Sequence, residues 1–176
     1  MAIWATAAAL TCGSLVLGAA EQPHSLNNFQ VVSDSLCRGA QPSGEGFREL
    51  AKLGVRTVLD LRGASGRSSK EAQEVRALGM NYVNIPLDGF LAPTPEQVSK
   101  IFAVLNDQTA GKIFVHCRRG ADRTGTVLAM YRIEHDHWTN QKALDEAMSM
   151  KMAAAEKLMQ KFVLGFKATP ATAAVN

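Results

Sequence analysis

A short apolar run leads directly into a polar loop and then into a helical pattern, and this succession constrains the fold more than any other stretch. The run covers residues 113–115 and the helical pattern covers residues 126–133. The run predicts a buried strand that ends at Cys117, and the pattern predicts a helix that opens near Arg123. Buried strands that alternate with helices are typical of α/β proteins with a parallel sheet.

The loop between them, residues 118–122, has the properties of an anion-binding site. Free backbone N–H groups and the positive end of the helix dipole converge where a strand passes into a helix. In such a field Cys117 favours its thiolate form, which is the reactive nucleophile. The guanidinium of Arg123 can bind two oxygens of an anion at once. The sequence therefore predicts a nucleophile, an anion site and a cationic clamp in one loop.

The stretch from His116 to Thr124 resembles the phosphate-binding loop of the cysteine-dependent protein tyrosine phosphatase superfamily. Three other stretches resemble its small bacterial dual-specificity-like branch, which includes inositol polyphosphate phosphatases (phytases): Cys37–Pro42, Val58–Arg62 and Tyr131–Ile133. The resemblance covers residues 30–150 and implies an α/β fold with a central, mostly parallel sheet and helices on both faces. It also implies phosphate ester hydrolysis through a phosphocysteine, without a metal ion or a cofactor.

The resemblance assigns further roles within the loop. Arg123 is expected to stabilise the charge on the transferred phosphate, and the predicted phosphate-binding residues are Arg118, Arg119, Gly120, Ala121, Asp122 and Arg123. His116 is expected to orient the loop and to tune the thiolate. The hydroxyl of Thr124 is expected to stabilise the thiolate and to assist the second step, in which the phosphocysteine is hydrolysed. In the simpler alternative, Thr124 only starts the helix.

Hydrolysis also needs a general acid that protonates the leaving group. Asp88 is the predicted acid, because it stands 29 positions before Cys117 in a loop that follows a strand, and Gly89 allows that loop to move. Its alternative role is turn formation, since Asp-Gly is a common turn pair. Asp122 is the possible alternative acid, and its own simpler role is to pair with a neighbouring basic side chain.

The substrate is predicted to be an inositol polyphosphate, such as phytate. Arg118 and Arg119 add two positive charges beside Arg123, and a cationic mouth concentrates polyanions. In the alternative, these arginines point to solvent or pair with acids, and the protein is a protein tyrosine or dual-specificity phosphatase with Phe90 as the aromatic wall. More distant alternatives are a rhodanese-like sulfurtransferase and a non-catalytic phosphate-binding module.

Strand and helix patterns alternate along the middle of the chain. Strands are predicted at residues 29–32, 36–38, 55–61, 82–85 and 112–115. Helices are predicted from Ser43 to Leu53, from a capping box at Ser68–Glu71 to before Gly79, from a second capping box at Thr94, and over residues 124–135, 139–150 and 153–166. Two polar residues at a strand end, Asp60 and Arg62, can rim the pocket or form a buried pair.

The ends of the chain are predicted to lie outside the phosphatase domain, which is assigned to residues 29–167. Residues 1–20 contain no charged side chain and end in small residues, which predicts a secretory signal peptide and a secreted or periplasmic protein. An uncleaved membrane anchor is the alternative. Residues 21–28 are predicted to be a linker and residues 168–176 a disordered tail.

Composition restricts the partners of the chain. The formal net charge of +3 is too small to indicate nucleic acid binding by itself, so the expected partner is a phosphorylated small molecule or phosphoprotein. After signal cleavage we expect no membrane contact and a monomer. Cys37 and Cys117 do not form a disulfide framework, and Cys37 is expected to be a half-buried strand residue, with regulatory pairing to Cys117 as the alternative.

Overall fold

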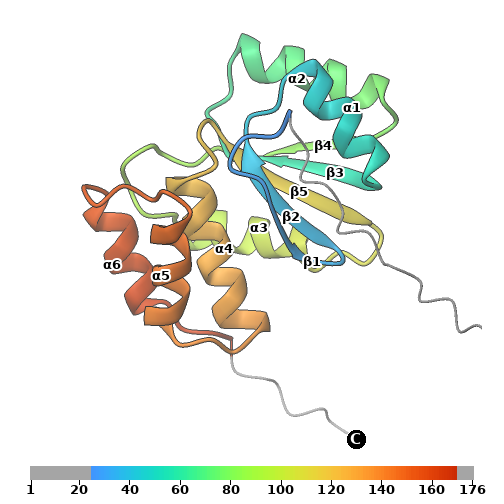
Figure 1. The fold of residues 1–176 in the computed structure, drawn as a ribbon. Coiled ribbons are helices and arrows are strands. Elements are labelled where there is room, and N and C mark those ends of the chain that lie inside the picture. The colour runs from blue at the N-terminus through green and yellow to red at the C-terminus, as the bar shows by residue number, and fades with distance from the viewer. Residues whose placement is uncertain (1–24, 170–176) are drawn as a thin grey trace, which may run out of the picture.

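The structure is a computed structural model that describes residues 25–169, and it shows a five-stranded sheet between two layers of helices (Figure 1). The strands are β1 (Gln30–Ser33), β2 (Leu36–Ala40), β3 (Val55–Asp60), β4 (Asn81–Asn84) and β5 (Lys112–Cys117). Their order in the sheet is β1-β2-β5-β3-β4, and only β1 runs antiparallel to its neighbour. The predicted mostly parallel sheet is confirmed.

Helices cover both faces of this sheet, as predicted. The helices are α1 (Gly44–Lys52), α2 (Gly66–Ala77), α3 (Pro95–Leu105), α4 (Asp122–His135), α5 (Asn140–Ser149) and α6 (Lys157–Gly165). Helices α1 and α2 pack on one face, where Phe47, Leu50 and Val75 join Val58 and Phe114 of the strands. On the other face, α3 and α4 pack on β3 and β5, and α5 and α6 pack against α4 (Figure 1).

Helix starts follow the capping residues of the sequence in most places. Ser43 and Thr94 each accept a backbone N–H as the N-cap, as predicted. Thr139 does the same for α5, whose predicted start was this residue. The prediction for α2 is wrong by three residues, because the cap is Ser65 and not Ser68. The two serines form a reciprocal capping box in which Ser68 is the third helical residue.

Two predictions at the ends of the chain differ from the structure. Residues 25–28 are not a free linker, because Leu26 is buried in the core beside α1 and Asn27 accepts a backbone hydrogen bond from Ala40. The last helix begins at Lys157, four residues later than predicted. The predicted signal peptide, residues 1–20, and all but two residues of the predicted tail, residues 168–176, lie outside the described residues.

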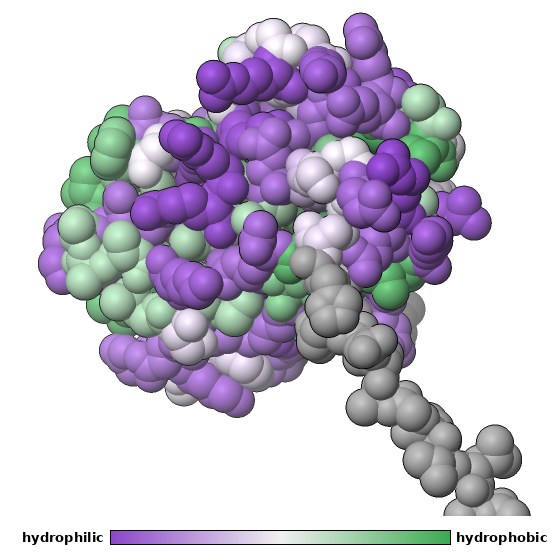
Figure 2. Space-filling view, turned by 45° about the horizontal axis from the view of Figure 1, so that its top comes forward, coloured by the Kyte–Doolittle hydropathy of each residue, from purple (hydrophilic) through white to green (hydrophobic). Residues whose placement is uncertain are grey.

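Apolar side chains also reach the surface of the helical layer. Leu158 and Leu164 of α6 are about half exposed, as is Leu91 of the β4–α3 loop. In the space-filling view, green hydrophobic areas lie between purple hydrophilic ones on the left, where α5 and α6 are found (Figure 2). No helix within residues 25–169 combines the length and the apolar character that a membrane crossing needs.

Candidate active site

The central strand β5 carries Cys117 to the carboxyl edge of the sheet, where ligands bind in parallel α/β folds. Its side chain is 2% exposed and borders a pocket of about 460 Å³. The pocket is lined by Gly89, Phe90, Cys117, Arg118, Arg119, Asp122, Arg123 and Glu156. The structure therefore brings the predicted nucleophile and the predicted clamp to one cavity.

The loop from Arg118 to Ala121 is shaped for an anion. Helix α4 begins at Asp122 without a side-chain cap, so its first backbone N–H groups have no capping acceptor. The amides of Arg119, Gly120 and Ala121 donate no hydrogen bond to another residue in the range 25–169. These free donors at a helix N-terminus favour a bound phosphate.

Buried groups fix this loop from behind. The carbonyl of Gly120 accepts from Asn28 Nδ2 at 2.9 Å and from the guanidinium of Arg38, which is 1% exposed. Burial lowers the pKa of Arg38 to about 10, so the guanidinium stays charged at neutral pH. Gly120 has φ +66°, and a Cβ there would overlap the carbonyl of Gly39 on β2. Glycine is therefore required at this position.

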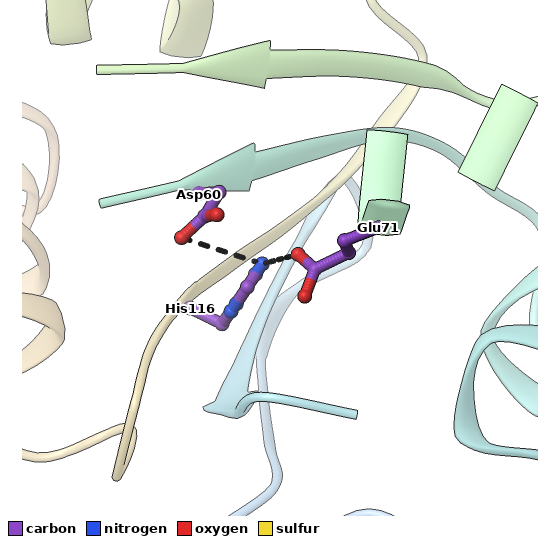
Figure 3. A group of neighbouring side chains, drawn as sticks. All are labelled: Asp60, Glu71 and His116. Atoms are coloured by element: carbon purple, nitrogen blue, oxygen red, sulfur yellow. Dashed lines mark ion pairs between the residues drawn. The ribbon is translucent and has the colours of Figure 1, made fainter. Parts of the chain in front are cut away.

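His116 points to the opposite face of β5 from its neighbour Cys117, because successive side chains of a strand alternate. It lies in a buried polar network (Figure 3). Its Nδ1 is 3.2 Å from the carbonyl oxygen of Cys117, and its Nε2 is 3.0 Å from Glu71 Oε1. Glu71 was not singled out as a functional residue by the sequence patterns. The sequence did contain a signal for Glu71, because this charged residue lies on the same helix face as the apolar residues Ala72 and Val75, which are buried.

Asp60 and Arg62 form the buried pair and do not rim the pocket. Arg62 donates from Nε and Nη2 to Asp60 at 2.8 and 2.6 Å, and Tyr82 also donates to Asp60 at 2.6 Å. Burial alone would raise the pKa of Asp60, but the bonds from Arg62, the charge of His116 and the Tyr82 hydroxyl lower it. Asp60 is therefore an ionised carboxylate that fixes the carboxyl end of β3 through its bonds from Arg62 and Tyr82.

The two candidate acids lie in different surroundings. Asp88 is exposed and accepts from the backbone N–H groups of Phe90 and Leu91 at 2.7 and 2.9 Å, so it forms the turn. Those bonds hold the pKa of Asp88 below its usual range, with a smaller contribution from Arg123. Its role as the general acid stays a prediction.

Asp122 is buried, and both of its carboxylate oxygens are occupied. One accepts from Arg119 at 2.5 Å and the other accepts from the N–H of Ala153 at 2.9 Å. Asp122 therefore pairs with a neighbouring basic side chain and ties the loop to the segment before α6. From that segment Glu156 reaches the pocket, which the sequence patterns did not predict.

Two further expectations concern Thr124 and Cys37. Thr124 is the third residue of α4 and not its cap, and its buried Oγ1 has no hydrogen-bond partner within residues 25–169. Cys37 is fully buried and not half-buried, and it aligns with Phe114, three positions from Cys117 on β5. Burial raises the pKa of the Cys37 thiol to about 12, which makes it unreactive near neutral pH.

A parallel sheet whose central strand ends in this cysteine, followed by a loop of free amides and an arginine, is the architecture of a cysteine-dependent phosphatase. A family model described as "DSP-PTPase phosphatase fused to NAD+ Kinase" matches residues 21–164. The chain belongs to this family of cysteine-dependent phosphatases.

Individual relatives have similar descriptions. The dual specificity protein phosphatase TpbA of Pseudomonas aeruginosa is 29% identical over 119 residues, which are 68% of this chain and 52% of TpbA, so the chain spans about half the length of that relative. The rice inositol diphosphatase DSP2 is 25% identical over 140 residues, which are 77% of this chain and 68% of DSP2.

Solved structures show the same fold. The core catalytic domain of the yeast PP-IP phosphatase SIW14 superposes with a TM-score of 0.72 at 21% identity, covering 81% of this chain and 87% of that one. A TpbA variant in complex with pTyr superposes with a TM-score of 0.67 at 23% identity, covering 78% and 83%.

Proposed function

We propose that this chain hydrolyses phosphomonoesters through a phosphocysteine, with inositol polyphosphates as the favoured substrates. The thiolate of Cys117 attacks phosphorus in line, and the bond between phosphorus and the leaving oxygen breaks. Asp88 gives its proton to that oxygen. Water then attacks the phosphocysteine, which releases inorganic phosphate and restores the thiolate.

The loop supplies the electrostatic stabilisation in this mechanism. The free amides of residues 119–121 and the guanidinium of Arg123 bind the phosphate oxygens, whose charge grows in the transition state. Thr124 keeps its hydroxyl unpaired within the described chain, so it remains available to the sulfur as phosphocysteine breaks down.

The observation that carries the substrate proposal is the set of three arginines around the pocket: Arg118, Arg119 and Arg123. One phosphate requires only Arg123 and the amides. Arg118 is exposed and forms no side-chain ion pair in the described residues, so it is free for a second phosphate. Similarity to the inositol diphosphatase DSP2 and to the PP-IP phosphatase SIW14 supports the same substrate class.

A phosphotyrosine substrate is the second candidate, and two observations favour it. Phe90 lines the pocket and is 74% exposed, so it can stack on a phenyl ring. Asp122 and Glu156 also line the pocket and offset part of its positive charge. The structure of TpbA with pTyr shows that a relative binds this group.

The test compares kcat/KM for inositol hexakisphosphate with kcat/KM for a phosphotyrosine peptide at one ionic strength. Arg118→Ala and Arg119→Ala should each lower kcat/KM for inositol hexakisphosphate about tenfold. This corresponds to about 1.4 kcal/mol, the free energy of one lost charge-assisted contact. The kcat/KM for the phosphotyrosine peptide should change less than threefold in both variants. This corresponds to roughly 0.5 kcal/mol, the usual size of the effect of a surface substitution.

Arg48→Ala is the matched control, because Arg48 is an exposed arginine of α1 that is paired with Glu45 and does not line the pocket. A wild type that prefers the peptide, with no selective loss of the inositol substrate in either variant, would reverse the order of the two substrates. Thiosulfate:cyanide transfer without phosphatase activity would instead indicate a sulfurtransferase.

The location of the protein is a separate proposal. We propose that cleavage after Ala20 leaves a mature chain that starts near Glu21, outside the cytoplasm and without a membrane anchor. N-terminal sequencing of the protein from fractionated cells tests this. Retention of Met1 on the cytoplasmic protein would contradict it.

A further inference from the structure

Glu71 connects three parts of the chain that lie far apart in the sequence. It is 3% exposed on the inner face of α2, where a lone carboxylate would be costly. Its Oε2 accepts from Arg62 at 2.6 Å and from Gln41 at 3.2 Å, and its Oε1 lies 3.0 Å from His116 Nε2. Figure 3 shows Glu71 and Asp60 approaching the imidazole ring from two different elements.

The imidazole of His116 lies between groups that accept hydrogen bonds. On one side, Nδ1 faces the carbonyl oxygen of Cys117, which can only accept. On the other side, Nε2 faces Glu71 Oε1 at 3.0 Å and Asp60 Oδ1 at 3.9 Å. The contact of Nε2 with Glu71 Oε1 has an ion-pair distance but lies outside hydrogen-bond geometry, so neither atom has a hydrogen-bond partner within residues 25–169 and their attraction is one of charge.

The charges around the ring favour the same state. Asp60 and Glu71 supply two negative charges and Arg62 supplies one positive charge, while the Tyr82 hydroxyl is neutral and donates to Asp60. With a neutral imidazole this buried cluster has one uncompensated negative charge, and with an imidazolium its charges balance. Arg62 and Gln41 donate to the other oxygen of the Glu71 carboxylate, which leaves Oε1 and its negative charge facing the imidazole.

A metal ion is a poorer occupant of this cluster. Asp60, Glu71 and His116 bring their polar atoms within 4.8 Å of one another, but the guanidinium of Arg62 already bridges the two carboxylates. A divalent cation would have to displace that guanidinium. The aromatic ring of Phe114 stacks on the imidazole at 5.6 Å and closes another side.

We propose that Glu71 is a positioning residue for the nucleophile, because it holds His116 as an imidazolium next to Cys117. The protonated Nδ1 fixes the carbonyl of Cys117, and the positive charge favours the thiolate. This inference rests on the proposed function only in taking Cys117 as the nucleophile. Glu71 touches neither the pocket nor the reacting atoms, so it acts through His116.

The first experiment reads the protonation state of His116 in the wild-type protein. Nitrogen NMR of the ring at pH 7 should show protons on both nitrogens, and Glu71→Gln should leave a neutral ring with a proton on one nitrogen. A neutral ring in the folded wild type would overturn the proposal. This measurement requires no variant, so a variant that fails to fold does not prevent the test.

The second experiment measures the rate of Cys117 alkylation by iodoacetamide as a function of pH, which does not depend on phosphatase activity. The midpoint of this profile should rise by about one pH unit in Glu71→Gln, which is a tenfold loss of thiolate below the midpoint. Glu74→Gln is the matched control, because Glu74 lies on the same helix and, within residues 25–169, forms an ion pair only with the exposed Lys70. Equal profiles for all three proteins would overturn the proposal.

A double-mutant cycle separates a positioning role from a purely structural one. In a His116→Asn background, Glu71→Gln should produce no further shift of the alkylation midpoint, because the two residues act as one unit. Additive shifts would show that Glu71 acts independently of His116, against the proposal. If the protein alkylates as predicted but hydrolyses no phosphomonoester, the proposed function fails and this inference stands.

Discussion

Two of the three segments that line the pocket are loops at the edge of the sheet, and they are held in opposite ways. In the β5–α4 loop, the carbonyl of Gly120 accepts hydrogen bonds from Asn28 and Arg38, and Gly120 packs against the backbone of Gly39. In the β4–α3 loop, Phe90 is 74% exposed. Apart from Gly89 and its two chain neighbours, no atom of residues 25–169 lies within 4 Å of the place where a Cβ would stand. The second loop is anchored by the bond from Gln97 to the carbonyl of Pro86 at 2.7 Å.

This difference matches the tasks that the mechanism gives to each loop. Attack on phosphorus and stabilisation of its oxygens need fixed geometry before the substrate arrives, which the buried supports of the first loop provide. Delivery of a proton to leaving groups of different sizes needs a wall that can adjust, which an exposed loop permits. One wall of the pocket is therefore preorganised and the other is adaptable.

The largest expected effect comes from removing the nucleophile of the rigid loop. Cys117→Ser should reduce turnover of p-nitrophenyl phosphate to background, while inositol hexakisphosphate or a phosphotyrosine peptide still binds, because serine is a far weaker nucleophile than a thiolate. Vanadate should inhibit the wild type and chelators should not. Unchanged turnover in Cys117→Ser would refute the covalent mechanism.

The next largest effect is expected when a glycine of each loop is replaced by alanine, which adds one methyl group. Gly120→Ala should destabilise the protein by about 3 kcal/mol, from overpacking and the left-handed backbone, and should cut kcat at least about 100-fold. Gly89→Ala should change stability by less than about 0.5 kcal/mol. Thermal denaturation and steady-state kinetics measure both variants, and equal costs would contradict the contrast between the loops.

A smaller effect is expected from the acid on the adaptable loop. Asp88→Asn should lower kcat/KM about 100-fold for poor leaving groups and much less for p-nitrophenol. Because the pKa of Asp88 is held below its usual value, its proton is present at low pH and is lost as pH rises through the acidic range. The wild-type rate should therefore fall with this loss, and the Asn variant should lack that limb of the profile.

Asp122→Asn is the comparison variant for this assignment. It removes the pairing with Arg119 but should change the rate less than threefold with any leaving group, because Asp122 has a structural role. A leaving-group effect in Asp122→Asn, with none in Asp88→Asn, would exchange the two assignments.

The smallest expected effect is a difference between the two loops in their susceptibility to proteolysis in the native protein. Cleavage by a protease without a preference for basic residues should occur first in the β4–α3 loop, where Phe90 and Leu91 are exposed, and not between Arg118 and Arg123. Mass spectrometry after brief digestion identifies the site. First cleavage next to Arg118 or Arg119 would contradict the rigidity of the β5–α4 loop.

The sequence predicted the parts of the site that are contiguous in the chain. Cys117 and Arg123 belong to one strand–loop–helix unit, so their proximity follows from local structure alone. The five strands and the parallel sheet were also predicted, because apolar runs alternate with helical patterns and capping residues mark most helix starts. The cap of α2 was misplaced because Ser65 and Ser68 both fit the pattern, and only the backbone geometry distinguishes them.

The parts that depend on distant contacts could not be predicted. Glu71 on α2 and Arg38 on β2 reach the nucleophile region only through the packing of the sheet and its helices. Glu156 enters the pocket because Asp122 binds the backbone of Ala153, a contact between segments thirty-one positions apart. Glu71 shares the buried face of α2 with Ala72 and Val75, so a charged residue on an amphipathic face was the signal that the sequence contained.

The contact between Gly120 and Gly39 restricts how the loop can change in a genetic selection. The atoms that a side chain at position 120 would meet are the carbonyl carbon and oxygen of Gly39 and the nitrogen of Ala40, which every amino acid has. No replacement at positions 39 or 40 can therefore make room for a larger residue at 120. Second-site suppressors of a Gly120 variant should be absent from β2, and true reversion to glycine should dominate among the recovered clones.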